Sequence, residues 1–261
     1  MTTIGLNELV LEKIDSVALL DPNNDDVSVR LTNVRDGSLS STAEGTAVTD
    51  NVGSTIMTLY NASAATLSAT NAVFSMDLAA AQFGEDKQVA SESTKIDVPT
   101  YEILTVAESK ITLSKTPKAG SVKYAYKLVN NGIAEKLELT TGAAAAGKFT
   151  VSTNELTFFS DVEAGTQIYV EYEYESTTAS KVSKKSDKFP GVYKARVYVV
   201  MHNVCNKNEI YTGVLVSNRA EIDPTSIEIG IASDSGHPFT LQFNKEYCSK
   251  DSELFSIIVD E

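Results

Sequence analysis

The chain has 261 residues, 42% of them hydrophobic and 22% charged, and its formal net charge is −13. This length is enough for one large or two smaller domains whose cores need no disulfide or metal. The negative charge argues against a nucleic-acid or anionic-membrane surface, because phosphate groups would on average be repelled.

The acidic residues are concentrated in the first part of the chain. Residues 1–95 hold 13 acidic and 5 basic side chains, a net charge of −8. The first residues lack a basic leader, and no run of about 20 apolar residues is present, so we expect a protein made and folded in the cytoplasm.

The first third of the chain contains one ambiguous segment, one clear strand and one polar stretch. Residues 9–22, LVLEKIDSVALLDP, fit either helical spacing or the two-residue alternation of a strand. The alternation in 27–34 predicts a strand. Residues 36–53 are rich in Gly, Ser and Thr and predict a mobile polar loop. Residues 54–69 predict one or two strands.

One substantial helix is predicted, over residues 72–83. Asn71 can cap its start, and Gly84 stands where a left-handed C-terminal cap is favoured. Residues 85–99 are polar and are expected to be irregular.

Residues 98–177 contain seven short alternating segments separated by turn residues. The segments are ILTV, KITLS, SVKYAYKLV, KLELT, KFTVS, ELTFF and QIYVEYEYE. Seven short strands in a stretch of this size favour an inserted immunoglobulin-like β-sandwich.

A second set of strands is predicted after the Ser/Thr/Lys-rich stretch 176–191. Its members are VYKARVYVVM, EIYTGVLVS, TSIEIGIA, FTLQF and LFSIIVD. We therefore expect a mainly β protein in which residues 1–97 and 178–261 form one sandwich- or barrel-like domain with a single short helix, interrupted by the inserted module.

Three stretches carry a resemblance to a known family. They are VALLDP followed by the polar 36–53 segment and the helix ending near Gly84, then the module ending QIYVEYEYE, and finally the long strands from VYKARVYVVM to LFSIIV. In order and pattern they resemble the tail tube proteins of tailed bacteriophages, with an inserted Ig-like domain.

The resemblance implies a structural virion protein that is not an enzyme. It implies homo-hexameric rings around a continuous inner β-barrel, stacked into a tube that also contacts other tail proteins. The 36–53 loop would contact the next ring. DNA would pass through the lumen without specific binding, and acidic residues of the 1–95 segment would line the channel wall.

The sequence predicts no catalytic, cofactor-binding or metal site. Residues 142–149, GAAAAGKF, match a phosphate-binding loop except at the last position and lie between two strands, so we interpret them as a hairpin loop. His202, Cys205, His237 and Cys248 could bind zinc only if folding brought them together, and buried free thiols are the simpler interpretation.

Two other groups of residues have a functional and a plain interpretation. The pairs Tyr124 with Tyr126 and Tyr172 with Tyr174 could form a carbohydrate-binding face, or they could pack across strands. The basic run Lys181, Lys184, Lys185 and Lys188 could contact DNA, or it could belong to a solvated linker.

Competing functions remain open from the sequence. A capsid decoration protein or an Ig-like surface adhesin would have a similar composition, and an enzyme would need a cleft with clustered ionisable groups.

Overall fold

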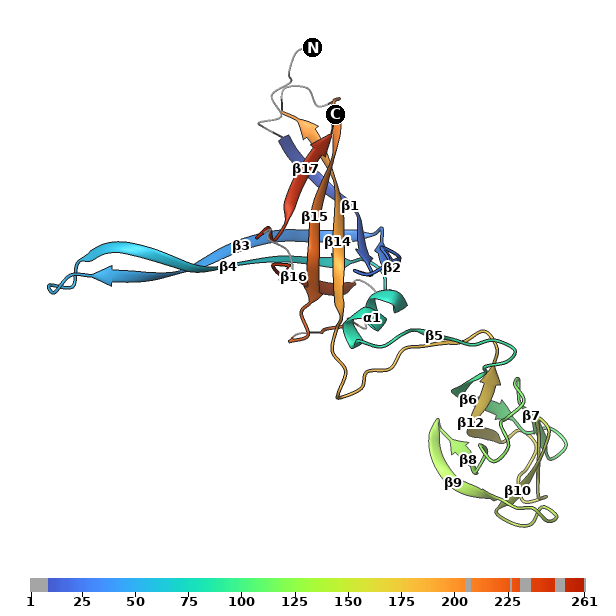
Figure 1. Ribbon diagram of the computed structural model, residues 1–261. Coiled ribbons are helices and arrows are strands. Elements are labelled where there is room, and N and C mark those ends of the chain that lie inside the picture. The colour runs from blue at the N-terminus through green and yellow to red at the C-terminus, as the bar shows by residue number, and fades with distance from the viewer. Residues whose placement is uncertain (1–8, 205–207, 226, 231–235, 247–251, 261) are drawn as a thin grey trace. The chain divides into compact units, whose positions relative to one another are not determined.

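The computed structural model describes residues 9–204, 208–225, 227–230, 236–246 and 252–260. The fold is mainly β, as the sequence predicted (Figure 1). The chain divides into two compact units. Unit 1 comprises Met1–Lys87 and Val182–Glu261, and unit 2 comprises Gln88–Lys181. The expected module boundaries, 98 and 177, lie inside unit 2.

Unit 1 is built on one antiparallel sheet of eight strands. The order is β2-β1-β14-β15-β16-β4-β3, and β17 also pairs with β15. Six of its strands are β1 (Leu9–Leu20), β2 (Val27–Leu31), β14 (Val192–Asn203), β15 (Ile210–Ile222), β16 (His237–Phe243) and β17 (Ser256–Asp260). The other two are β3 (Val34–Thr49) and β4 (Thr55–Asn71).

The ambiguous opening segment forms β1. It pairs with β14 along its whole length, but it pairs with β2 only over Val17–Leu20. Val17 and Leu19 are fully buried, whereas Val10 and Leu11 are exposed. Its mixed periodicity arises because the second half packs in the core and the first half does not.

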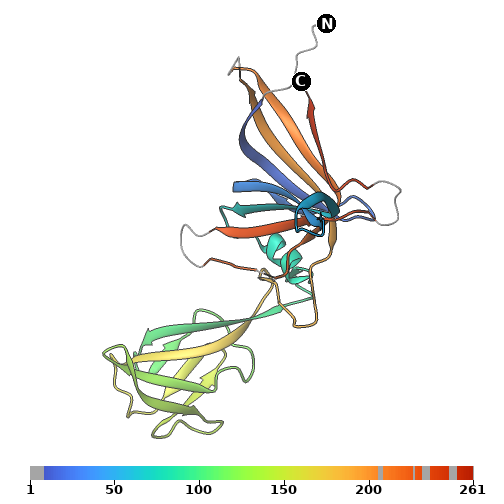
Figure 2. The same cartoon turned by 90° about the vertical axis from the view of Figure 1, so that its left-hand side faces the viewer.

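The predicted polar loop 36–53 was wrong. Residues up to Thr49 continue β3, which pairs with β4 in a long hairpin that extends away from the rest of unit 1 (Figures 1 and 2). Only Asp50–Ser54 form the turn. Ser, Thr and Ala are compatible with extended backbone, and the paired strand supplies the hydrogen bonds that the composition alone does not reveal.

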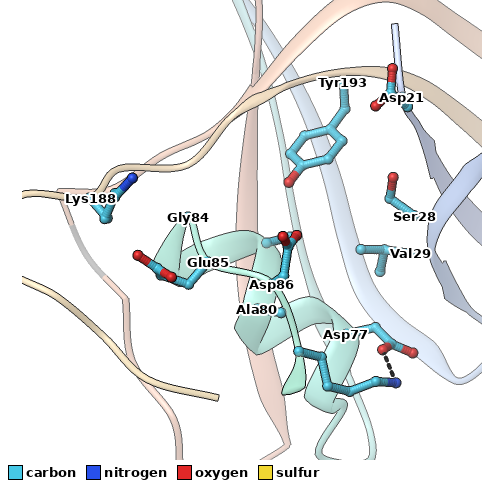
Figure 3. A pocket seen from close by; sticks show the side chains of 12 residues that line it. Asp21, Ser28, Val29, Asp77, Ala80, Gly84, Glu85, Asp86, Lys188 and Tyr193 are labelled. Atoms are coloured by element: carbon cyan, nitrogen blue, oxygen red, sulfur yellow. Dashed lines mark hydrogen bonds and ion pairs between the residues drawn. The ribbon is translucent and has the colours of Figure 1, made fainter. Parts of the chain in front are cut away.

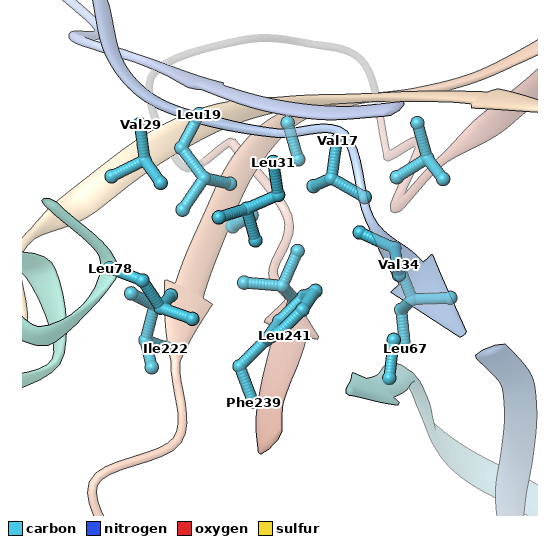
Figure 4. Close-up of a cluster of buried hydrophobic side chains, with 14 of the residues drawn as sticks. Val17, Leu19, Val29, Leu31, Val34, Leu67, Leu78, Ile222, Phe239 and Leu241 are labelled. Atoms are coloured by element: carbon cyan, nitrogen blue, oxygen red, sulfur yellow. The ribbon is translucent and has the colours of Figure 1, made fainter. Parts of the chain in front are cut away.

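The core of unit 1 lies between the inner face of the sheet and the helix (Figure 4). Val17, Leu19 and Leu31 from the first two strands meet Leu78 of the helix and Leu241 of β16. Each large aliphatic side chain buried in this way contributes about 1.5–3 kcal/mol relative to its exposed state.

The helix α1 (Met76–Phe83) begins later than predicted. Ser75 is its N-cap, and the Ser75 Oγ accepts a hydrogen bond from the Leu78 N–H at 3.2 Å. Asn71 instead ends β4, and its side-chain amide donates to the Val73 carbonyl at 2.6 Å. Gly84 adopts the expected left-handed conformation, with φ of 70°.

Unit 2 contains a seven-stranded path in the order β6-β12-β8-β9-β10-β11-β7. The strands are β6 (Ile96–Thr105), β7 (Lys110–Thr112), β8 (Tyr124–Val129), β9 (Gly132–Leu139), β10 (Lys148–Ser152), β11 (Glu155–Phe158) and β12 (Gln167–Ser176). They enclose a separate core that includes Phe149 and Tyr172. The seven predicted strands are all present, while the immunoglobulin-like assignment stays a prediction.

A short ribbon joins the two ends of unit 2. It consists of β5 (Gln88–Val89) and β13 (Ser180–Lys181), paired antiparallel. The 85–99 segment is therefore less irregular than expected, since β6 also begins at Ile96. The strand predicted at TSIEIGIA is wrong, because 223–225 and 227–230 have no regular structure.

Candidate assembly surfaces of unit 1

One end of the unit 1 sheet is a single layer with two open edges. Its order is β1-β14-β15-β17, all antiparallel, and it stands at the top of Figure 1. No other strand of the described chain pairs with the outer edge of Leu9–Ser16, or with the outer edge of β17. Open edges of this kind are templates for pairing with another chain.

Large apolar side chains are exposed on both faces of this layer. Ile257 and Ile258 are adjacent on β17, so they point to opposite faces, and both are more than half exposed. Val10 and Leu11 are likewise adjacent on β1, point to opposite faces and are more than half exposed. No charged residue or proline interrupts Ser256–Val259. Soluble proteins normally protect an exposed edge with such residues. The β17 edge lacks them before Asp260, whereas the outer edge of β1 carries Glu12, Lys13 and Asp15.

The β3–β4 hairpin is the second candidate surface. Residues 35–49 and 51–60 are exposed on both faces, and Glu44 and Asp50 are the only charged residues between Gly37 and Ala64. From the register, Val48, Met57 and Leu59 share one face, while Ile56 and Tyr60 share the other. Tyr60 has 73% of its surface exposed.

The hairpin is ordered along its length by local interactions. Asp50 Oδ1 accepts hydrogen bonds from Val52 N–H at 2.9 Å and Ser54 N–H at 2.8 Å, which fixes the tip. Near the middle, a side chain on Gly45 would lie 2.7 Å from Thr58 and 3.2 Å from the Tyr60 ring. The Tyr60 ring therefore covers the glycine backbone. A two-stranded ribbon is marginal alone in water, and the apolar side chains on both faces of this one are exposed.

The outward face of the sheet carries charges of both signs. Ala195 and Val197 point into the core, so Lys194 and Arg196 point away from it. Asp260 lies on the same outward face, through its register with Thr212. Two acidic residues of the 1–95 segment contact this face: Asp25 pairs with Lys194, and Glu12 with His202. Others lie at the hairpin and in the pocket described next. The expectation that acids of this segment line a channel wall stays a prediction.

A surface pocket of about 510 Å³ lies between the helix and the start of β14 (Figure 3). Four carboxylates line it, from Asp21, Asp77, Glu85 and Asp86. Two have lysine partners: Lys87 pairs with Asp77, and Lys185 Nζ lies 2.9 Å from Glu85. Burial, followed by the nearby Asp86 and Asp21, raises the pKa of Tyr193. Among the described residues, no group of three His, Cys, Asp or Glu side chains is placed to hold a metal ion.

The two histidines do not converge. His202 pairs with Ile210 at one end of β15, whereas β16, which begins at His237, pairs with the other end at Ala220–Ile222. The His202 Nε2 lies 2.6 Å from Glu12 Oε2. Cys205 and Cys248 lie outside the described residues.

His237 is fully buried and has a structural role. The Ser75 N–H donates to its Nδ1 at 3.3 Å, so the proton is on Nε2, which donates to Gln82 Oε1 at 2.8 Å. Gln82 in turn donates to the Pro238 carbonyl, and the Phe74 ring stacks on the imidazole at 5.1 Å. Burial lowers the pKa of His237. This network ties the helix to β16, and sequence spacing could not reveal it.

Two of the four lysines in the basic run, Lys184 and Lys185, have intramolecular partners. The Lys184 ammonium donates to the carbonyls of Phe83 and Lys188, so it stabilises the C-terminal end of the helix, and Lys185 pairs with Glu85. These contacts favour the structural interpretation of the run over a DNA contact.

The predicted tyrosine pairs divide between core and surface. Tyr172 is buried, and Tyr174 packs against the same core. Tyr124 and Tyr126 lie on the outer face of β8. The 142–148 loop joins β9 to β10, so it lacks the strand-to-helix setting of a phosphate-binding loop.

Comparison with known proteins identifies the family. No helix within the described residues is long and apolar enough to cross a membrane. No curated protein matches the chain. The family model of the YomU/Tube protein family matches residues 9–250, which is most of the chain. The protein therefore belongs to the YomU/Tube protein family and is a phage-related, tube-like virion component.

Proposed function

We propose that this chain is the subunit of a phage tail tube, which self-assembles into stacked hexameric rings around a DNA ejection channel. The observation that carries the proposal is the single-layer end of the unit 1 sheet, whose two outer edges and exposed apolar side chains no described strand covers. Membership of a tube family supports it.

Ring closure would join the two open edges. Strands alternate in direction along β1-β14-β15-β17, so β17 runs antiparallel to β1. In a cyclic ring, the neighbour's β1 can then continue the sheet beside β17 with antiparallel pairing. This head-to-tail contact is heterologous, and such contacts form closed rings when the rotation closes. Closure would also bury Leu11 and Ile257 at the junction.

The hairpin would connect copies beyond the ring plane. Its apolar side chains on both faces suit an arm held between two protein surfaces, and its near absence of charge removes the desolvation cost of burying ions. We propose that it reaches the neighbouring ring, the contact first expected for residues 36–53.

DNA would move through the lumen without specific binding. We place the outward face of the sheet on the channel wall, where Lys194, Arg196 and Asp260 mix both signs. Lys194 is already paired with Asp25 at 2.6 Å, which limits its attraction for phosphate. Low friction would then come from a wall without a strong net positive charge rather than from an acidic excess.

This function is structural rather than enzymatic. The subunit would be made in the host cytoplasm and would end in the virion tail, where other tail proteins are its further partners.

Electron microscopy of the purified full chain tests the proposal. We expect rings or tubes of uniform bore. A Leu11→Cys, Ile257→Cys double variant should form oxidised ladders ending at the hexamer, whereas each single variant, which retains the native Cys205 and Cys248, should not. A chain that stays monomeric at high concentration, or that forms a trimer binding only to capsids, would contradict the tube function.

A further inference from the structure

Three tyrosines from three strands of unit 2 lie side by side on the outer face of its sheet. The rings of Tyr101 and Tyr169 stack with centroids 5.6 Å apart, and Tyr126 lies 6.2 Å from Tyr169. Ile168 and Val170 alternate with Tyr169 and point into the core, so the row points outward. Tyr101 has 63% of its surface exposed.

The row continues into a groove of about 400 Å³. Tyr126 belongs to both, and Tyr124 forms the next aromatic wall, with the Lys136 ammonium 3.7 Å from its ring centroid on one side. The charged lining consists of Glu171 and Glu173 together with Lys118 and Lys123, so the groove carries both signs. This volume is within the range of about 300–1,000 Å³ typical of small-ligand sites.

Packing inside unit 2 accounts for only part of this arrangement. Cross-strand tyrosine pairs do stabilise sheets, but the core of unit 2 is complete on the other face, where Tyr172 is buried and its hydroxyl donates to Glu102. The outer row leaves Tyr101 largely exposed and Tyr124 partly exposed, with 40% of its surface accessible, beside an open groove. The exposed rings are therefore available to a ligand.

We propose that this face binds a neutral oligosaccharide. A sugar ring has an apolar C–H face, which packs on an aromatic ring, and hydroxyls, which donate to carboxylates such as Glu171 and Glu173. Because two carboxylates and two lysines line the groove, no net positive charge selects phosphate or acidic glycans. A protein partner is disfavoured because charged residues are depleted at the centres of protein interfaces, and here they lie in the middle of the surface.

This site is independent of tube assembly, so its test uses binding alone. The full chain is titrated with neutral hexasaccharides of glucose and of N-acetylglucosamine, linked β-1,4 or α-1,4, and binding is followed by ligand-observed NMR and calorimetry. We expect at least one to bind, and we expect Tyr101→Ala to weaken it by about tenfold or more. Glu171→Gln, at an exposed position with no packing role, should also weaken it.

Phe159→Ala is the matched control, because Phe159 is an exposed aromatic of unit 2 outside the row and the groove. It should bind as the unmodified chain does. The proposal is overturned if none of these oligosaccharides binds at millimolar concentration, if Tyr101→Ala and Glu171→Gln leave binding intact, or if a sulfated or phosphorylated glycan competes more strongly than the neutral one.

Discussion

Acidification should destabilise unit 1 through His237. The imidazole is fully buried, its Nδ1 accepts from the Ser75 N–H, and burial lowers its pKa below the ordinary value. A proton added to Nδ1 would face another donor. The unfolded chain, by contrast, binds that proton near pH 6.5.

The sign and size of the effect follow from linkage. Because the folded pKa is depressed, the stabilising contribution is complete above the unfolded pKa of about 6.5 and is lost as pH falls towards the folded pKa. If the folded side chain stays neutral, unit 1 loses about 1.4 kcal/mol between neutral pH and pH 5.5.

A matched variant isolates this contribution from all other titrations. In His237→Gln the side chain cannot titrate, so the difference in unfolding free energy between the unmodified protein and the variant should shrink by that amount over the same interval. Urea unfolding at a series of pH values, with hydrogen exchange at the amides of the helix as a local probe, measures it. A difference that is constant with pH would refute the reasoning and show that His237 is accommodated in its charged form.

Three further predictions concern packing and assembly. Gly84→Ala should lower the stability of unit 1 by more than about 1 kcal/mol in thermal unfolding, because φ is 70° and the new methyl group would lie 2.0 Å from the Phe189 carbonyl oxygen; Gly120→Ala, also at positive φ but in open space, should cost less. Ile56→Lys with Tyr60→Lys should abolish tubes in electron microscopy while circular dichroism stays unchanged, since both side chains are exposed in the free subunit, and intact tubes would remove the hairpin from the interface. Deleting unit 2 and rejoining its flanks with a short flexible linker should leave assembly intact, and a folded remainder that fails to assemble would place unit 2 in the interface.

Strand alternation in the sequence predicts most of the sheet, because each strand has one face in a core. The segments around Val197, Leu215 and Ile168 alternate clearly, and all form strands with those residues buried. The sequence did not predict the hairpin, because alternation arises only where a strand has one buried face. Residues 35–49 have no buried face, so they carry no alternation, and their Ser, Thr and Gly content indicated a loop.

The candidate surfaces depend on pairing between distant segments, which local sequence does not contain. Val17 lies opposite Val197, and the open edges of β1 and β17 are recognisable only once these partners are known. The sequence identified only some of the tyrosines on the outer face of unit 2. Tyr124 and Tyr126 were singled out, but Tyr101 and Tyr169 join them only through the β6-β12-β8 order.

The ribbon formed by β5 and β13 has a consequence for how such a protein can change over time. It holds the two ends of unit 2 as neighbouring strands, whose backbones are about 4.8 Å apart. For unit 1, the connection between Lys87 and Val182 therefore behaves like a tight turn, because the folded unit 2 already holds its two ends together. Closing this connection costs little entropy, whatever the size of unit 2. A module attached in this way can be acquired, lost or replaced in one recombination step, so the properties of unit 2 can diverge while the sheet of unit 1 stays the same.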